Sequence, residues 1–278
     1  MGALVLGGGG LTGISWEWGV LSGLAAAGID LTRADLVVGT SAGSVVGAQV
    51  AAGLDLEERF AAQLAPLDAG PPARMGRVDL ARSAWAVLSS RAPARAGARL
   101  GRMALNARTI PEAERAAVMR SRLPVREWPE RPLLVTAVDA ATGAFTVFDR
   151  SGEATLLEAV GASCAVPGVY PPVTIGGRRY IDGGARSATN ADLAAGHDAV
   201  VVIAPITQGF GAIKGVADQA AELRRAGAEV VVISPDPASR RAFGRNSLDP
   251  ARRPPAARAG RRQAAAIAEA VAAVWTAG

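Results

Sequence analysis

Cysteine, histidine and lysine each occur only once in this sequence of 278 residues, as Cys164, His197 and Lys214. A single cysteine excludes a disulfide framework and a zinc site built from cysteines, and a single histidine excludes a histidine-rich metal centre. Any catalysis by histidine has to use His197. Half of the residues are apolar, which excludes a disordered chain, and the length is that of one domain or of two small ones.

Long apolar runs are also missing, and none approaches the roughly 18–20 residues that span a bilayer. Residues 1–6 lack the positive charge that begins a secretory signal peptide, and they run directly into four glycines, which is typical of a buried first strand. We therefore expect a soluble, cytoplasmic protein.

Acidic residues are the minority, since 25 acids stand against 30 basic residues and the net charge is +5. Two segments carry more than this whole excess: residues 74–131, with 13 arginines and 5 acids, and residues 240–262, with 8 arginines and 1 acid. The rest of the chain is net acidic. Four of these arginines are spaced to form one stripe on a helix: Arg91, Arg95, Arg99 and Arg102. The stripe fits either a solvated face or a segment attracted to anionic lipid, so peripheral contact of 74–131 with an anionic membrane is one expectation. No nucleic-acid-binding motif is recognisable, and nucleic acid is not an expected partner.

Short apolar runs alternate with helical periodicities along most of the chain, which predicts a parallel sheet of the α/β class. The expected strands are residues 3–6, 34–38, 132–138, 144–148, 179–181, 199–204 and 229–234. The expected helices are residues 14–25, 41–52, 55–64, 155–162, 216–226 and 264–275. We predict one domain over residues 1–278, with a doubly wound, mostly parallel sheet between helices.

Two segments depart from this alternation. Residues 66–131 are rich in proline, alanine and arginine, and they are expected to form an inserted helical segment, or cap, without strands. Residues 240–262 are expected to be a basic loop before the C-terminal helix.

A G-x-S-x-G pattern lies between a predicted strand and a predicted helix, as Gly39-Thr40-Ser41-Ala42-Gly43. In this context the pattern predicts a nucleophile elbow, a sharp turn that exposes the serine hydroxyl at a helix N-terminus, where negative charge is favoured. Gly39 and Gly43 are small enough to permit the turn. The alternative is a serine that only caps a helix in a glycine-rich turn.

The first predicted strand ends in another glycine-rich pattern, Gly7-Gly8-Gly9-Gly10-Leu11-Thr12-Gly13. Gly8, Gly10 and Gly13 match the dinucleotide fingerprint G-x-G-x-x-G, but that fingerprint requires an acidic residue where the second strand runs into Ser41. The loop is better suited to donate backbone amides to an oxyanion. Because both loops follow parallel strands, they meet at the same edge of the sheet.

A serine nucleophile needs a base, and two side chains are candidates. Ser41, Asp182 and His197 follow the chain order of the α/β-hydrolase triad. However, His197 comes directly before a predicted strand, at the sheet edge opposite Ser41, where a turn histidine is the simpler interpretation. Asp182 follows a short strand, and the next two residues, Gly183 and Gly184, let the backbone turn so that the carboxylate projects. A turn aspartate is the alternative, but Asp182 is the better base.

Three blocks in this order resemble the patatin-like phospholipases: G-G-G-G-L-T-G at Gly7–Gly13, G-T-S-A-G at Gly39–Gly43, and D-G-G at Asp182–Gly184. Residues 162–168 also resemble the family segment that leads to the aspartate. The resemblance implies the patatin-like fold and hydrolysis of lipid or fatty-acyl esters, without a metal or another cofactor. It assigns Ser41 as nucleophile, Asp182 as general base and the amides of Gly8, Gly9 and Gly10 as oxyanion hole.

One position departs from the family pattern. The family usually has arginine or lysine directly before the last glycine of the glycine-rich loop, and this sequence has Thr12. The backbone donors survive this change, but a positive charge is lost. A lipid- or nucleotide-binding protein with impaired catalysis is therefore the alternative from another functional class.

Overall fold

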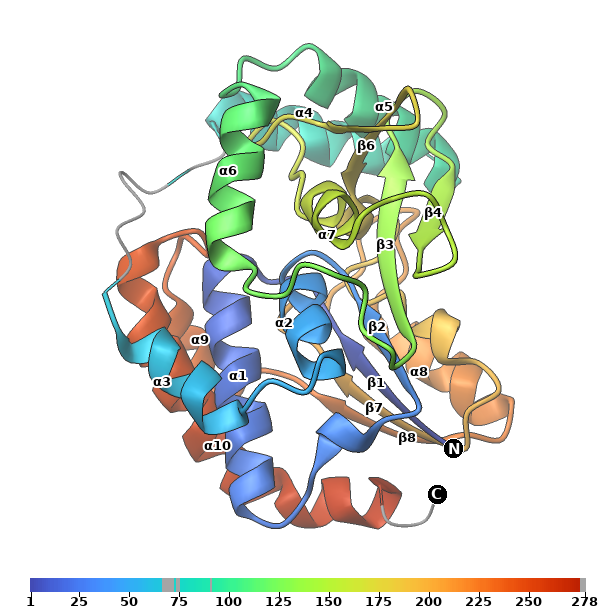
Figure 1. Ribbon diagram of the computed structural model, residues 1–278. Coiled ribbons are helices and arrows are strands. Elements are labelled where there is room, and N and C mark those ends of the chain that lie inside the picture. Colours follow the sequence, from blue (N-terminus) through green and yellow to red (C-terminus); the bar gives the residue numbers. More distant parts are fainter. Residues whose placement is uncertain (67–72, 74–75, 91, 276–278) are drawn as a thin grey trace.

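One sheet of eight strands organises the computed structural model, which describes residues 1–66, 73, 76–90 and 92–275 (Figure 1). The strands are β1 (Gly2–Leu6), β2 (Leu36–Gly39), β3 (Leu133–Asp139), β4 (Phe145–Phe148), β5 (Val173–Ile175), β6 (Arg178–Asp182), β7 (Ala199–Ile203) and β8 (Glu229–Ile233). Their order is β5-β6-β3-β2-β1-β7-β8, and β4 pairs with β3. The five neighbouring strands β3, β2, β1, β7 and β8 are parallel to one another. The strands β4, β5 and β6 join the sheet through antiparallel pairs. The predicted α/β class with a mostly parallel sheet is confirmed.

Helices cover both faces of the sheet. They are α1 (Gly10–Ala26), α2 (Ala42–Ala51), α3 (Leu56–Leu64), α4 (Arg77–Leu88), α5 (Pro93–Leu105), α6 (Glu112–Arg122), α7 (Leu156–Ser163), α8 (Val216–Arg225), α9 (Pro237–Phe243) and α10 (Arg253–Trp275). Figure 1 shows α1, α2 and α10 on one face and α8 on the other. Among the described residues, no helix combines the length and the apolar character needed to cross a membrane.

The first strand shows how the sequence divides between these two faces. Leu4 and Leu6 belong to the core on the α1 side, and Ala3 and Val5 belong to the core on the α8 side. All four side chains are fully buried. A strand with helices on both faces is apolar at every position, which is why β1 is a continuous apolar run rather than an alternating one.

Residues 66–131 contain α4, α5 and α6 and, in the part that the structure describes, no strand. Of the predicted arginine stripe, Arg91 lies outside the described residues. Arg95 and Arg102 on α5 are exposed, while Arg99 is half-buried. This segment is therefore helical as expected, and part of its basic surface faces solvent.

Two helices begin well before their predicted start, and one strand was not predicted. The last helix begins at Arg253, so most of the predicted basic loop 240–262 is helical. Pro254 and Pro255 lie in the first turn of α10, where a missing N–H costs no hydrogen bond. The first helix begins at Gly10, because it starts inside the glycine-rich loop. The structure also adds β5, which the prediction missed.

Candidate active site

Ser41 lies at the sharp turn between β2 and α2. Its φ of 52° and ψ of −116° place a non-glycine residue in backbone space that costs energy, as expected for a nucleophile elbow. Gly43 permits the turn, because a Cβ at that position would lie 2.0 Å from the Leu6 carbonyl oxygen. Gly39 is also crowded, with Ser44 as its nearest neighbour. The elbow therefore holds Ser41 against the carboxyl end of β1.

Asp182 reaches Ser41 through the register of β3. Residues 133–135 of β3 pair with β2, and residues 137–139 of the same strand pair with β6 in the opposite direction. Since β4 occupies the other side of β3, β2 and β6 lie end to end, with their carboxyl ends facing each other. Gly39 and Asp182 pair with residues only two apart on β3, namely Val135 and Ala137.

The two predicted catalytic side chains are in direct contact. The Ser41 hydroxyl donates a hydrogen bond of 2.6 Å to Oδ2 of Asp182, and the Gly184 amide donates one of 2.7 Å to Oδ1. Burial raises the pKa of Asp182 from 3.8 to about 6, although both hydrogen bonds favour the ionised form. Gly183 lies so close to Thr136 that a Cβ would come within 2.2 Å of the Thr136 hydroxyl oxygen. The Asp-Gly-Gly turn thus keeps the carboxylate buried and aimed at Ser41.

The glycine-rich loop packs directly against the elbow, but its amides are not equivalent. The Gly43 amide donates to the Gly7 carbonyl at 3.0 Å, which joins the two loops. The Gly8 amide donates to the Ala188 carbonyl at 2.7 Å and is therefore not free for an oxyanion, which corrects the sequence prediction. Within the described part of the chain, the amides of Gly9 and Gly10 have no protein acceptor. They lie at the N-terminus of α1.

Thr12 and Gly13 complete the first turn of α1. Thr12 is fully buried, and its hydroxyl donates to the Gly9 carbonyl at 3.3 Å while its amide donates to the Ser247 carbonyl at 3.0 Å. The Gly13 amide donates to the Gly9 carbonyl at 2.8 Å. Thr12 therefore stabilises the loop from inside and does not replace the missing charge.

The last residue of α7 and the two residues after it hold the backbone at Ser41 and at Asp182. The Ser41 amide donates to the Ser163 hydroxyl at 2.8 Å, and the Cys164 thiol donates to the Ser41 carbonyl at 3.3 Å. The Asp182 amide donates to the Ala165 carbonyl at 3.0 Å. Burial raises the pKa of Cys164 to about 12, so its thiol stays protonated. The sequence marked this segment only by its resemblance to the family, and it gave no sign that Ser163 contacts the elbow.

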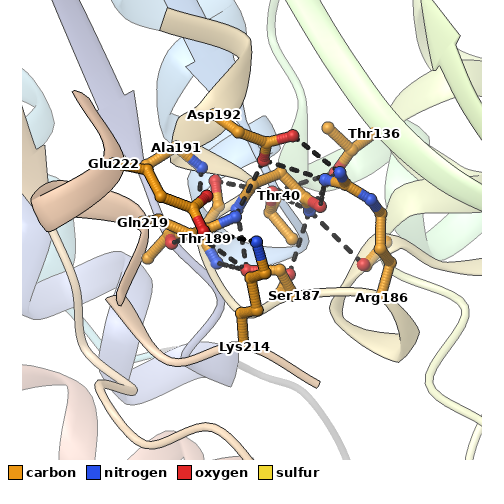
Figure 2. Close-up of polar contacts among 12 residues, drawn as sticks. Thr40, Thr136, Arg186, Ser187, Thr189, Ala191, Asp192, Lys214, Gln219 and Glu222 are labelled. Atoms are coloured by element: carbon orange, nitrogen blue, oxygen red, sulfur yellow. Dashed lines mark hydrogen bonds and ion pairs between the residues drawn. The ribbon is translucent and has the colours of Figure 1, made fainter. Parts of the chain in front are cut away.

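On the α8 side of the sheet, the residue before Ser41 enters a buried polar network (Figure 2). The hydroxyls of Thr40 and Thr136 lie 2.9 Å apart, and the Asn190 side-chain amide donates to Thr40 at 3.0 Å and to the Ser187 carbonyl at 2.9 Å. Asn190 is fully buried with a positive φ of 49°. This network holds the elbow from the α8 side of the sheet, and no motif in the sequence points to Asn190.

Gln219 of α8 closes the same network. Its side-chain oxygen accepts from the Thr189 hydroxyl at 2.7 Å and from the Ser187 hydroxyl at 3.0 Å, and its side-chain amide donates to Asp192 at 2.8 Å. Arg186 adds an ion pair of 2.6 Å with Asp192 (Figure 2). The segment between Asp182 and β7 is thereby tied to α8 and to the elbow.

A pocket opens on the other side of Ser41. Apolar side chains from α1, α2, α6 and the loops near them form most of its wall: Leu11, Ile14, Val45, Met119, Val166 and Leu248. Arg115 and Arg122 of α6 also line it. In the sequence these two arginines are recognisable only as members of the basic segment 74–131, and no pattern places them at the site.

A carboxyl group also lies near the glycine-rich loop. Glu17 of α1 is fully buried, and neither of its carboxyl oxygens has a hydrogen-bond partner among the described residues. Burial raises its pKa well above 4.5, and the nearby Gly7 amide offsets this only in part. Burial therefore favours the protonated form of Glu17.

His197 lies at the other edge of the sheet. It precedes the amino end of β7, and its Nδ1 is 3.2 Å from the Ala194 carbonyl oxygen. Ser41 lies beyond the carboxyl end of the parallel strands. The length of a five-residue strand, about 16 Å, therefore separates the sheet edge near His197 from the edge near Ser41. The triad alternative with His197 is therefore wrong. Among the described residues, no group of three or more histidine, cysteine, aspartate or glutamate side chains is placed to hold a metal ion.

Comparisons with known proteins agree with the motif analysis. The model of the family described as patatin-like phospholipase matches residues 4–195, while no curated protein matches the chain. Among solved structures, VipD from Legionella pneumophila is 14% identical with a TM-score of 0.47, and the match covers 97% of this chain and 66% of VipD. The type III effector protein ExoU is 16% identical with a TM-score of 0.45, and the match covers 97% of this chain and 53% of ExoU. The chain thus spans less than two thirds of either protein. Since the family model matches more than half of its residues, the chain belongs to the patatin-like phospholipase family.

Proposed function

We propose that this chain is a serine acyl-ester hydrolase that acts on lipids through a dyad of Ser41 and Asp182. The observation that carries the proposal is the hydrogen bond of 2.6 Å between the Ser41 hydroxyl and the Asp182 carboxylate, at a backbone turn that only a constrained site retains. The membership in a family of phospholipases supports a lipid ester as the substrate.

The reaction begins with proton transfer from Ser41 to Asp182. The serine oxygen attacks the ester carbonyl, and a tetrahedral oxyanion forms. Asp182 returns the proton to the leaving alcohol as the acyl-enzyme forms. Water then attacks the acyl-enzyme with Asp182 again as base, which releases the fatty acid and restores Ser41. A pKa of about 6 makes Asp182 a better base than an ordinary carboxylate and leaves it ionised at neutral pH.

The amides of Gly9 and Gly10 are the proposed donors to the oxyanion. Neither amide has an acceptor among the residues that the structure describes, and both lie at the start of α1, whose N-terminus favours negative charge. The Ala42 amide at the start of α2 is a further donor, because Ala42 follows the nucleophile and lines the pocket. The apolar wall of the pocket accommodates the acyl chain.

A fluorophosphonate probe tests the proposal, because it phosphonylates an activated serine. We expect the intact mass of the wild-type chain to increase by one probe group, and we expect no increase for Ser41→Ala. His197→Ala is the matched control and should be labelled at the wild-type rate. A wild-type chain that resists the probe and hydrolyses no lipid ester would favour the catalytically impaired binding protein.

We also propose that residues 74–131 contact anionic membranes. Trp85 and Leu88 on α4 are 65% and 61% exposed, and Arg95 and Arg102 on the neighbouring α5 are exposed as well. Exposed apolar and basic side chains together favour an anionic lipid surface. Co-sedimentation should increase when phosphatidylserine is added to phosphatidylcholine vesicles, and it should decrease with salt. Binding that ignores both would contradict this contact.

A further inference from the structure

Two arginines of α6 line the same pocket as Ser41. Arg115, Met119 and Arg122 are separated by four and three residues, so they share one face of the helix, and all three line the pocket that contains Ser41. Arg115 is only 8% exposed. Arg122 is half-buried, so the charge of this helix face lies at the wall of the pocket.

Neither arginine is neutralised by a side chain that the structure describes. Among the described residues, no carboxylate forms an ion pair with Arg115 or Arg122, and no acceptor binds their guanidinium groups. The guanidinium carbon of Arg115 lies 3.6 Å from the centre of the Tyr170 ring. Stacking on an aromatic ring engages the face of a guanidinium and leaves the N–H groups along its edge for a ligand.

The two charges also disfavour each other. Burial lowers the pKa of Arg122, and the nearby charge of Arg115 lowers it further. Arg253 lies close enough for the charge of Arg122 to lower its pKa as well. Buried cations in proteins are normally paired with an anion, and an unpaired cluster costs stability. Since the described part of the chain supplies no such anion beside Arg115 and Arg122, this pair of arginines is suited to an anion that arrives with the ligand.

We propose that Arg115 and Arg122 bind an anionic phosphate group of the ester substrate, so that this chain prefers acyl esters of glycerol phosphate to neutral glycerides. The inference rests on the proposed hydrolase function and specifies its substrate class. Guanidinium groups bind phosphate through paired, charge-assisted hydrogen bonds, and two of them beside an apolar wall match a group with a charged head and an acyl chain.

This arrangement also accounts for Thr12. The basic residue that the family usually has in the glycine-rich loop is absent, and Thr12 is turned into the loop. Arg115 and Arg122 place positive charge beside Ser41 from a different element, the helix α6.

The test compares two substrates with the same single acyl chain, lysophosphatidate and monoacylglycerol, in neutral detergent micelles. For the wild-type chain we expect kcat/KM to be about 10–100-fold higher for lysophosphatidate, which is the usual effect of hydrogen bonds to a charged group. Arg115→Gln and Arg122→Gln should each remove most of this preference. Arg120→Gln is the matched control, because Arg120 lies on the exposed side of the same helix, and it should keep the wild-type ratio. Equal kcat/KM values for the two substrates, or an unchanged ratio in both pocket variants, would overturn the proposal.

Inorganic phosphate separates the subsite from the hydrolase function and from the lipid headgroup. We expect inorganic phosphate to raise the Tm of the wild-type chain, and to raise the Tm of Arg115→Gln less. This result does not depend on whether any ester is hydrolysed. If the wild-type chain neither hydrolyses an ester nor reacts with the fluorophosphonate probe, the proposed function is wrong. If phosphate raises the Tm of Arg115→Gln as much as that of the wild-type chain, the phosphate subsite is wrong. Protection by lysophosphatidate but not by free phosphate would show that the subsite needs the acyl chain as well.

Discussion

The two sides of Ser41 differ in how their polar groups are satisfied. On the α8 side, Thr40, Asn190 and Gln219 belong to a buried network in which each side chain has a partner (Figure 2). On the pocket side, Arg115 and Arg122 have no anionic partner in the described part of the chain. A satisfied network fixes a structure, whereas an unsatisfied charge beside a cavity is available to a ligand. The satisfied side therefore holds the elbow, and under the proposed function the pocket side receives the substrate.

Asp182 lies where the two sides meet, and among the substitutions considered its replacement should reduce the rate of hydrolysis most. Asp182→Asn removes the base but keeps the shape, so we expect hydrolysis to slow by about 10³-fold. The measurement is kcat/KM with an ester that the wild-type chain hydrolyses. Activity within tenfold of wild type would exclude Asp182 as the base.

The same variant should change the dependence of stability on pH. Because the folded-state pKa of Asp182 is raised to about 6, the wild-type chain loses stability as the pH rises from about 4 to about 6. Asparagine does not titrate. Chemical denaturation should therefore show the variant gaining up to about 3 kcal/mol relative to wild type between pH 4 and pH 7.

Asn190→Ala disrupts the hydrogen-bond network on the α8 side. It leaves Thr40 and the Ser187 carbonyl with fewer partners and places alanine at a positive φ, so we expect a loss of about 3 kcal/mol in the free energy of unfolding. Urea denaturation measures the loss. Asn190→Gly is the control, because glycine relieves the backbone strain and should recover only part of it. An Asn190→Ala chain as stable as wild type would show that the network does not hold the elbow.

On the pocket side, Arg122→Met should change the free energy of unfolding in the opposite direction to Asn190→Ala and by a smaller amount. The substitution removes an unpaired, partly buried charge and keeps an unbranched apolar side chain, so we expect unfolding to cost about 1 kcal/mol more than in wild type. The same urea series measures it. A clear loss of stability would mean that Arg122 has a structural role.

Much of this site follows from the sequence. Ser41 and Asp182 could be paired without the structure, because glycine patterns after strands indicate sharp turns at one sheet edge and because His197 precedes its strand. The reason that they meet lies in the end-to-end placement of β2 and β6 along β3, and this depends on an antiparallel strand that local patterns do not place. Gly176 and Gly177, which both have positive φ, mark the hairpin from β5 to β6 and were the one available signal.

The remaining features depend on tertiary contacts. The spacing of Arg115 and Arg122 is visible in the sequence, but their direction is set by how α6 packs beside the pocket. A solvated helix and a helix that lines a site have the same pattern of arginines. The Gly8 amide likewise donates its hydrogen bond to the carbonyl of Ala188, which is far away in the sequence. No local pattern therefore distinguishes Gly8 from Gly9 and Gly10.

The most direct test of the dyad is the rate of fluorophosphonate labelling as a function of pH. We predict that the wild-type rate rises with pH through a midpoint near 6, the pKa of Asp182, and that His197→Ala keeps the same midpoint. Asp182→Asn should react slowly and without that midpoint. A midpoint that persists in Asp182→Asn, or one that disappears in His197→Ala, would contradict the dyad.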